Sequence, residues 1–241
     1  MNLIIDIGNT RAKLALFKDE ELFHIEIVRH DEFLKSALML IENHQVKKGI
    51  ISSVVFFQKD EITKISEKIE LLELSSELKL PFKNNYGTPK TLGVDRMALV
   101  AAAVNEFPNK NVLVIDAGTC ITYDFVSAAK EYSGGAISPG IEMRYKALHD
   151  FTSKLPLLSR KEAIEVIGNS TAESMHSGVV HGVLGEIYNF VSLYKGENDF
   201  FTVVLTGGDT NYLANKLKID IFAQPNFLLK GLNTILIYNN H

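Results

Sequence analysis

The sequence predicts an α/β fold in which mixed sheets carry helices on their faces. Three strand-like segments open the chain, and helical and strand-like segments alternate after them. Antiparallel strands followed by such an alternation form a mixed sheet covered by helices. A second observation is a repeat, because an apolar run that ends in Asp and continues to Gly and Thr occurs at residues 3–10 and again at 112–119. The repeat predicts two halves of similar construction.

Each copy of the repeat has the pattern of a β-hairpin whose turn faces an anion. The residues that carry the pattern are Asp6, Gly8 and Thr10 in the first copy and Asp116, Gly118 and Thr119 in the second. Glycine lets a backbone approach a ligand closely, while turn amides and Thr hydroxyls supply hydrogen-bond donors. Such a turn suits the oxygens of a phosphate group.

The aspartates add a condition to this interpretation. Asp6 and Asp116 would repel a triphosphate unless a cation lay between them, and Mg²⁺ favours a few carboxylates together with phosphate oxygens and water. The alternative is two ordinary hairpin turns, since a single Asp-x-Gly-x-Thr hairpin is a weak signal. Two copies favour the phosphate interpretation. The glycine-rich motifs of P-loop and dinucleotide-binding proteins are absent from the sequence.

Composition limits the classes of protein that fit. The chain has 241 residues, of which 46% are apolar and 22% charged, enough for one large or two modest globular domains. A formal charge of −4 predicts no general affinity for nucleic acid or membrane. The single cysteine, Cys120, cannot form an internal disulfide, so we expect a cytoplasmic protein and a small buried side chain there. We expect neither a signal peptide nor a membrane-spanning segment.

The middle of the chain carries a second set of candidate residues. After a strand at 21–28, Asp31 is expected to cap a helix, and a turn-rich stretch at 81–95 contains Tyr86. Asp95 and Arg96 follow immediately before a predicted helix. Asp95 has the place of an N-cap, which is the simpler interpretation, but such a carboxylate also suits chemistry at a loop–helix junction. Tyr86 is either a ligand wall or an anchor for its loop.

The second half of the chain repeats the alternation of strands and helices. Gly134-Gly135 predicts a bend, and Pro139 suits the first turn of a helix. Ser170 and Glu173 form a capping box at the start of a long helix. A strand then leads to a Gly-Gly turn, and a final helix at 227–238 is expected to close the second domain.

Four motifs in order resemble the type III pantothenate kinases, which belong to the acetate and sugar kinase and actin-like superfamily. They are Asp-Ile-Gly-Asn-Thr at 6–10, Gly-Val-Asp-Arg at 93–96, Asp-Ala-Gly-Thr at 116–119 and Gly-Gly-Ala-Ile-Ser-Pro-Gly at 134–140. The resemblance implies two related actin-like (ribonuclease H-like) domains, at 1–110 and 111–241. It also implies ATP-dependent phosphorylation of pantothenate, the first step of coenzyme A biosynthesis.

The resemblance also implies roles for individual residues. Asp95 would be the catalytic base. ATP would bind through Asp6, Ile7, Gly8, Asn9, Thr10, Arg11, Ala12, Lys13 and Thr119. Pantothenate would bind through Tyr86, Gly93, Val94, Asp95, Arg96 and Thr171, with Thr171 supplied by the partner in a homodimer. Asp6 would act near Mg²⁺ through water, and Asp116 would hold a monovalent cation, K⁺ or NH₄⁺.

Two other functions fit part of the pattern. A sugar kinase of the same superfamily fits the hairpins equally well, although the Gly-x-Asp-Arg motif and the short chain disfavour it. A nucleotide-binding accessory regulator of transcription would need no catalytic base. The charge of −4 argues against direct contact with DNA, and the presence of Asp6, Asp95 and Asp116 favours an enzyme.

Overall fold

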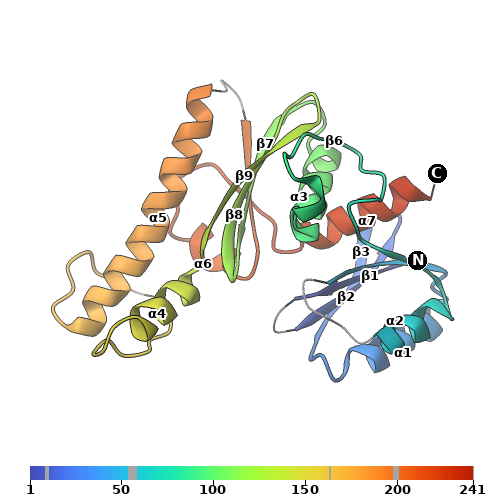
Figure 1. Cartoon of the computed structure of the whole chain (residues 1–241), viewed down its shortest axis with the longest axis horizontal. Coiled ribbons are helices and arrows are strands. Elements are labelled where there is room, and N and C mark those ends of the chain that lie inside the picture. The colour runs from blue at the N-terminus through green and yellow to red at the C-terminus, as the bar shows by residue number, and fades with distance from the viewer. Residues whose placement is uncertain (9–10, 54–58, 163, 198–200, 241) are drawn as a thin grey trace. The chain divides into compact units, whose positions relative to one another are not determined.

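Two mixed sheets flanked by helices make up the protein, which confirms the predicted α/β fold class (Figure 1). The computed structural model describes residues 1–8, 11–53, 59–162, 164–197 and 201–240. By its contacts the chain divides into two compact units. The first unit comprises residues 1–108, 130–133 and 226–241, and the second comprises 109–129 and 134–225. No helix in the described part of the chain has the length and apolar character needed to cross a membrane.

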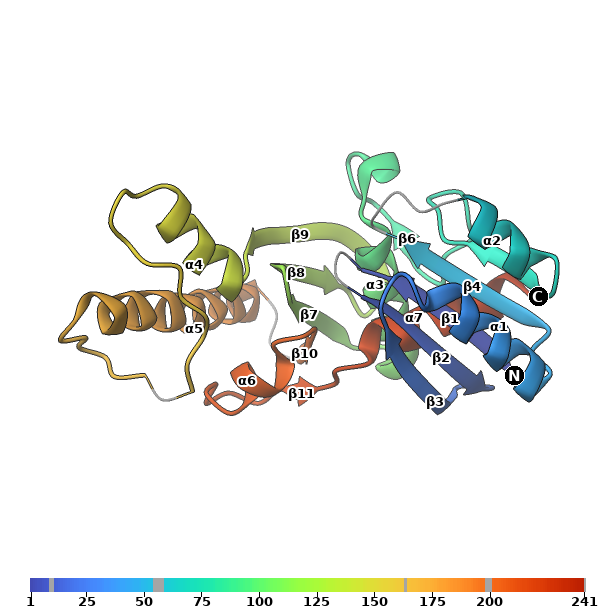
Figure 2. The ribbon, with the colours of Figure 1, turned by 90° about the horizontal axis from the view of Figure 1, so that it is seen from below.

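The first unit is built on a five-stranded sheet of order β3-β2-β1-β4-β5 (Figure 2). Its strands are β1 (Asn2–Ile7), β2 (Ala12–Lys18), β3 (Glu21–Val28), β4 (Lys48–Ser53) and β5 (Glu70–Glu73). The first three form an antiparallel meander, while β4 runs parallel to both β1 and β5. Each turn between the meander strands is short, as sequential antiparallel strands allow.

Helices cover both faces of this sheet. On one face, Leu3, Ile5 and Ile7 of β1 share a core with helix α1 (Phe33–His44) and with Ile65 of helix α2 (Lys59–Ser66). On the other face, helix α7 (Phe227–Asn239) contacts β1 and β4, and helix α3 (Val94–Glu106) contacts β4 and α7 (Figure 1). Because side chains alternate along a strand, Asp6 lies on the face covered by α3 and α7.

The second unit repeats this topology. Its strands are β7 (Asn111–Ala117), β8 (Cys120–Val126), β9 (Glu131–Pro139), β10 (Phe201–Thr206) and β11 (Phe222–Ala223), in the order β9-β8-β7-β10-β11. Strand β8 is antiparallel to β7, while β10 is parallel to β7 and to β11. Each unit therefore has a hairpin at its centre and a parallel strand beside the strand that carries the aspartate.

Helices α4 (Ile141–Asp150), α5 (Thr171–Glu197) and α6 (Thr210–Ala214) complete the second unit. Buried residues of α4 and α5 share a core with β7 and β8. A polar network ties the same elements together, because the Tyr123 hydroxyl donates to Glu186 over 2.9 Å and Arg144 pairs with the same carboxylate. Arg144 also donates to the Ser138 hydroxyl over 2.8 Å, which fixes the end of β9 to α4.

Several predicted local features differ from the structure. The N-cap position of helix α1 is Glu32, whose side chain makes no capping hydrogen bond, and Asp31 instead forms an ion pair with Arg29 on the surface. Pro139 is the last residue of β9, so the next helix begins only after Gly140. The expected bend at Gly134-Gly135 lies inside the continuous strand β9, where Gly134 adopts a φ of 123°. Only glycine takes such a φ without strain. The two glycines therefore allow an irregular backbone within β9 and do not end the strand.

The turn-rich stretch before α3 contains little regular structure, as its sequence predicts. It includes the two-residue strand β6 (Lys83–Asn84) and the 3₁₀-helix η1 (Pro89–Thr91). Strand β6 pairs with the start of β9, at residues that belong to the first unit. The stretch is therefore held in place by one short parallel pairing.

The C-terminal helix packs differently from the prediction. We expected residues 227–238 to close the second domain, but α7 belongs to the first unit, where it packs along α3. The predicted domain bounds, 1–110 and 111–241, describe the two halves of the sequence repeat. Grouping residues by contacts does not test these bounds, so they stay a prediction.

The contact between α3 and α7 brings the two backbones together at Gly231. A Cβ atom placed there would overlap the Ala98 carbonyl. We therefore expect Gly231→Ala to lower the free energy of unfolding by about 1–3 kcal/mol, because the helices must separate to admit it. Urea unfolding measures this change.

Gly185→Ala is the matched control for this prediction. Gly185 is an exposed residue inside helix α5, and a Cβ there would meet nothing within 4 Å. Alanine is the better helix former by roughly 1 kcal/mol, so this variant should be as stable as the wild type or more stable. Equal loss of stability in both variants would contradict the close packing of α3 on α7.

Candidate active site

The first hairpin places Asp6 at the end of β1, between two strands. In the sheet register, Asp6 lies opposite Lys13 of β2 on one side and Ser52 of β4 on the other. The turn is closed by the Gly8 amide, which donates to the Arg11 carbonyl over 3.1 Å. His30 contacts the Gly8 carbonyl through Nε2 at 3.1 Å. The hairpin turn is thus fixed both internally and by a residue that follows β3.

The predicted ATP residues of this hairpin divide into three groups. The Ile7 and Ala12 side chains are fully buried, so only their backbones are available to a ligand. Arg11 is exposed and Lys13 is partly exposed. Asn9 and Thr10 lie outside the described residues.

The electrostatic environment of Asp6 links the hairpin to helix α3. Burial raises the pKa of the Asp6 carboxyl from its ordinary value of 3.8 to about 6. The positive charge of Lys13 opposes this rise, whereas the negative charge of Asp95 adds to it. Asp6 and Asp95 therefore lie close enough to interact, although 89 positions separate them in the sequence.

Asp95 belongs to the first turn of α3 and is not its N-cap. The cap is Gly93, and the helix begins at Val94, so the predicted capping role of Asp95 is wrong. Its Oδ1 accepts a hydrogen bond of 2.8 Å from the Arg96 amide. A Cβ at residue 93 would overlap that carboxylate oxygen. Glycine at this position therefore leaves room for the Asp95 side chain to lie over the start of the helix.

Arg96 is buried beside the aromatic residue of the preceding loop. Its side chain is 4% exposed, and its guanidinium carbon lies 5.5 Å from the centre of the Tyr86 ring. The Tyr86 ring stacks on Tyr132, with centroids 6.2 Å apart, and Phe82 packs edge-on against Tyr132. A cation over an aromatic face is attracted by the ring quadrupole. The loop before α3 and its first turn are thus joined through Tyr86 and Arg96.

In the second unit, the second hairpin turn receives two glycine-containing segments. The Gly140 amide, just after β9, donates to the Thr119 carbonyl over 3.1 Å. A Cβ at Gly140 would overlap the Gly118 carbonyl, so this position admits only glycine without a shift. Thr119 itself is exposed. The last glycine of the segment 134–140 is thereby seated on the turn.

The Gly-Gly turn after β10 lies against Asp116. Gly207 has a φ of 94°, and a Cβ there would overlap both the Asp116 carboxylate and the Ala117 carbonyl. The Asp209 amide donates to the same Ala117 carbonyl over 2.9 Å. Burial raises the pKa of the Asp209 carboxyl, although its ion pair with Arg160 opposes that rise. Three motifs that are distant in sequence therefore meet around Asp116.

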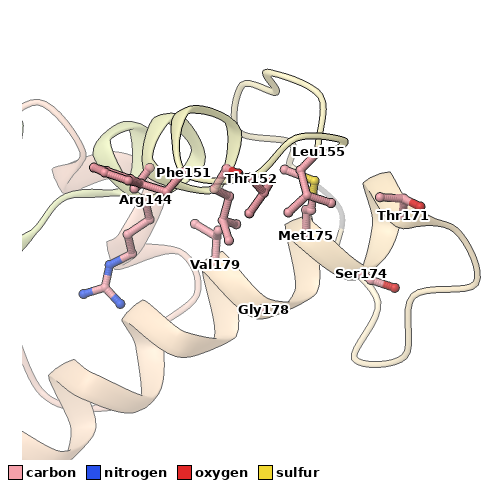
Figure 3. A pocket seen from close by; sticks show the side chains of 11 residues that line it. Arg144, Phe151, Thr152, Leu155, Thr171, Ser174, Met175, Gly178 and Val179 are labelled. Carbon is pink, nitrogen blue, oxygen red and sulfur yellow. Dashed lines mark hydrogen bonds between the residues drawn. The ribbon is translucent and has the colours of Figure 1, made fainter.

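Thr171 lies elsewhere in the second unit, as the first residue of α5. It lines a cavity of about 880 Å³ between α4, the segment that follows α4, and α5 (Figure 3). The wall is mostly apolar and includes Leu148, Phe151 and Val179. None of the hairpin residues from Asp116 to Thr119 lines this cavity. Within its own unit, Thr171 is therefore not brought to the second hairpin turn.

Three residues in these surroundings were not identified from the sequence. Tyr132 supports Tyr86, His30 contacts the first turn, and Ser52 lies beside Asp6. Ser52 lies opposite Asp6 because β4 runs parallel to β1 and must place some residue there. Nothing in the sequence connects Tyr132 with Tyr86, since the link depends on the pairing of β6 with β9.

The Asp6 carboxylate, with the Asp95 carboxylate near it, fits a magnesium–nucleotide complex. Mg²⁺ usually takes one or two carboxylates and completes its shell with phosphate oxygens and water. Asp6 is partly buried and has Asp95 nearby, so added positive charge would relieve the repulsion between them. Among the described residues, no group of three or more His, Cys, Asp or Glu side chains is placed to hold a metal ion.

Comparisons with known proteins concern the chain as a whole. A sequence profile of the type III pantothenate kinases matches residues 2–193. The chain is 45% identical over 239 residues to a type III pantothenate kinase from Flavobacterium psychrophilum, and the match covers 99% of each chain.

Solved structures show the same fold at lower identity. A Campylobacter jejuni protein, described as a candidate Baf family transcriptional activator, has a TM-score of 0.67 at 23% identity, covering 99% of this chain and 98% of its own. A candidate N-acetylmannosamine kinase from Listeria monocytogenes has a TM-score of 0.56 at 14% identity, covering 100% and 99%. At these identities the likenesses show that the chain shares its fold with both proteins. The full-length identity and the family profile together identify the chain as a member of the type III pantothenate kinase family.

Proposed function

We propose that the protein transfers the γ-phosphoryl group of ATP to the primary hydroxyl of pantothenate, with Asp95 as the base. The observation that carries this proposal is that Asp95, at the start of α3, lies near enough for its negative charge to raise the pKa of Asp6 at the end of β1. Phosphoryl transfer depends mainly on positioning and on stabilisation of charge. Asp6 beside the phosphates and Asp95 beside the acceptor alcohol would provide this positioning and charge stabilisation.

The first hairpin supplies the phosphate side of the site. Lys13 lies opposite Asp6 in the register, so a polyphosphate at the turn would meet a cationic side chain as well as backbone donors. Arg11, at the exposed end of the turn, adds a second positive charge. When bound, Mg²⁺ would supply positive charge that stabilises the transferring phosphoryl group, with Asp6 oriented toward it through water.

The start of α3 supplies the acceptor side. Asp95 would orient the pantothenate hydroxyl and accept its proton, which typically contributes about 10²–10⁴-fold to the rate. Arg96 keeps a permanent charge suited to a carboxylate, and it is held by Tyr86. The backbone at Gly93 and Val94 and the Tyr86 ring would complete this side of the pocket.

The second unit would contribute Thr119 to the phosphates and Asp116 to a monovalent cation, K⁺ or NH₄⁺. Gly207 closes tightly on Asp116, which supports a structured environment for that carboxylate. Extra positive charge near the phosphates would add to electrostatic stabilisation of the transition state.

A homodimer in the cytoplasm completes the proposal. Thr171 is exposed at the start of α5 and lies away from the second hairpin turn of its own unit. Because Thr171 is exposed, its hydroxyl is open to a partner subunit, whose pantothenate site it would join. Ser174, Gly178 and Gly182 continue along α5 as exposed small residues, which would let another helix approach closely.

We expect Asp95→Asn to lower kcat by about 10²–10⁴-fold without loss of the fold, because the amide cannot accept the proton. The measurement is a coupled assay with ATP, Mg²⁺, K⁺ and pantothenate, accompanied by a thermal melt. Glu106→Gln serves as the control, since Glu106 is the last residue of the same helix, roughly 16 Å along its axis. Wild-type kcat in Asp95→Asn would remove the base assignment.

The same assay separates the proposal from a sugar kinase and from a nucleotide-binding regulator. N-acetylmannosamine in place of pantothenate tests the first, and ATP binding without turnover of either substrate would favour the second. Replacing K⁺ by Na⁺ tests the role of Asp116, because full turnover in Na⁺ alone would exclude a requirement for K⁺.

A third prediction follows from the raised pKa of Asp6. Because the folded pKa of about 6 exceeds the ordinary 3.8, ionised Asp6 destabilises the free protein above about pH 6, and this cost disappears below about pH 4. The difference corresponds to at most about 3 kcal/mol. Asp6→Asn should therefore be more stable than the wild type at pH 8 but not at pH 4, as measured by urea unfolding. A stability difference that does not change with pH would contradict the burial of this charge.

A further inference from the structure

Ser52, at the end of β4, holds a buried hydroxyl that has no hydrogen-bond partner among the described residues. Its side chain is 1% exposed, so the oxygen is not open to bulk solvent. Most buried polar groups in proteins are hydrogen-bonded, and one left unpaired costs about 1–3 kcal/mol. A polar side chain kept at this cost suggests a task other than stability of the free protein.

The register of the sheet places this hydroxyl beside Asp6. Strands β1 and β4 pair in parallel with Asp6 opposite Ser52, and neighbouring strands lie about 4.8 Å apart. Ile5 and Ile51, the preceding pair, both enter the core shared with α1. Because side chains alternate, Asp6 and Ser52 both lie on the opposite face, where α3 contacts β4.

The other neighbour of Asp6 explains how a partner could become available. In the free protein, Lys13 lies opposite Asp6 on β2 and interacts favourably with its charge. A polyphosphate bound at the turn would compete for the Lys13 ammonium group. The Asp6 carboxylate would then lose part of the favourable interaction with the Lys13 charge. Ser52, on the other neighbouring strand, has the nearest hydroxyl in the register that could donate a hydrogen bond to it.

The second sheet contains the same arrangement. Asp116 of β7 lies opposite Thr206 of the parallel strand β10, and the Thr206 side chain is also 1% exposed. Each hairpin aspartate is therefore flanked by a buried hydroxyl from the parallel strand. The two sheets therefore share a hydroxyl side chain next to the hairpin aspartate.

We propose that Ser52 is a positioning residue of the phosphate site, whose hydroxyl donates a hydrogen bond to the Asp6 carboxylate when a magnesium–nucleotide complex binds. This inference rests on the proposed function, since it assumes that the first hairpin holds the nucleotide. The bond forms in the loaded protein and fixes the direction of the carboxylate. In the free protein, the hydroxyl contributes nothing to stability.

The test is Ser52→Ala, examined by a thermal melt and by nucleotide binding. If the hydroxyl were purely structural, its loss would lower the Tm as well as the affinity. A thermal melt of the free protein should show a Tm equal to or above that of the wild type, because an unpaired buried hydroxyl has been removed. Calorimetric titration with the Mg²⁺ complex of β,γ-imido-ATP should show binding about tenfold weaker, as expected for loss of one hydrogen bond to a charged group.

Two further variants sharpen the test. Ser52→Thr keeps the hydroxyl, as Thr206 does in the second sheet, and should bind within about twofold of its wild-type strength. Ser53→Ala makes the same chemical change one residue later, where the side chain lies on the opposite face of the sheet, and should leave binding unaltered.

Undiminished binding by Ser52→Ala would overturn the proposal, and so would a lower Tm or failure to fold, because either indicates a structural hydroxyl. Equal weakening by Ser53→Ala would also overturn it. If the wild-type protein itself failed to bind the nucleotide complex, the proposed function would be rejected first, and this role for Ser52 with it.

Discussion

The candidate site depends on one electrostatic constraint, which is the partial burial of the Asp6 carboxylate at the end of a central strand. Lys13 and Ser52 flank it in the sheet, and Asp95 acts on it from the start of α3. A partly buried carboxylate with a second one nearby is unfavourable in the free protein. In the proposed function, positive charge that arrives with a nucleotide would offset this repulsion. The proposed role of Asp6 and the energetic cost of its charge would then have the same physical origin.

The repeated sheet topology accounts for how this constraint is built twice. In each unit, the aspartate ends the first strand of a hairpin, and a parallel strand brings a small hydroxyl beside it. The units differ in what closes the turn. His30 contacts the first turn, whereas Gly140 and Gly207 are seated on the second. The common framework therefore supports two carboxylates in different surroundings.

The sequence alone predicts those parts of the protein that depend on local pattern. The two hairpins, the long amphipathic helix with its Ser170 cap and the turn-rich stretch before α3 are found as expected, and Ser170 does accept from the Glu173 amide. The four sequence motifs also predicted the type III pantothenate kinase family, which the comparisons confirm. The sequence does not predict long-range packing, because nothing in the local pattern of α7 shows that Gly231 packs against the Ala98 backbone of α3. The start of α3 at Val94 likewise has no strong local signal, because the Gly93 cap makes no side-chain hydrogen bond.

Calorimetric titration of ATP into the protein at pH 8, with Mg²⁺ and with EDTA, tests the central claim most directly. If the buried carboxylate pair requires a cation, ATP should bind at least about tenfold more weakly in EDTA, and Asp6→Ala should remove most of that difference. Equal affinity of the wild type for ATP with and without Mg²⁺ would contradict the account.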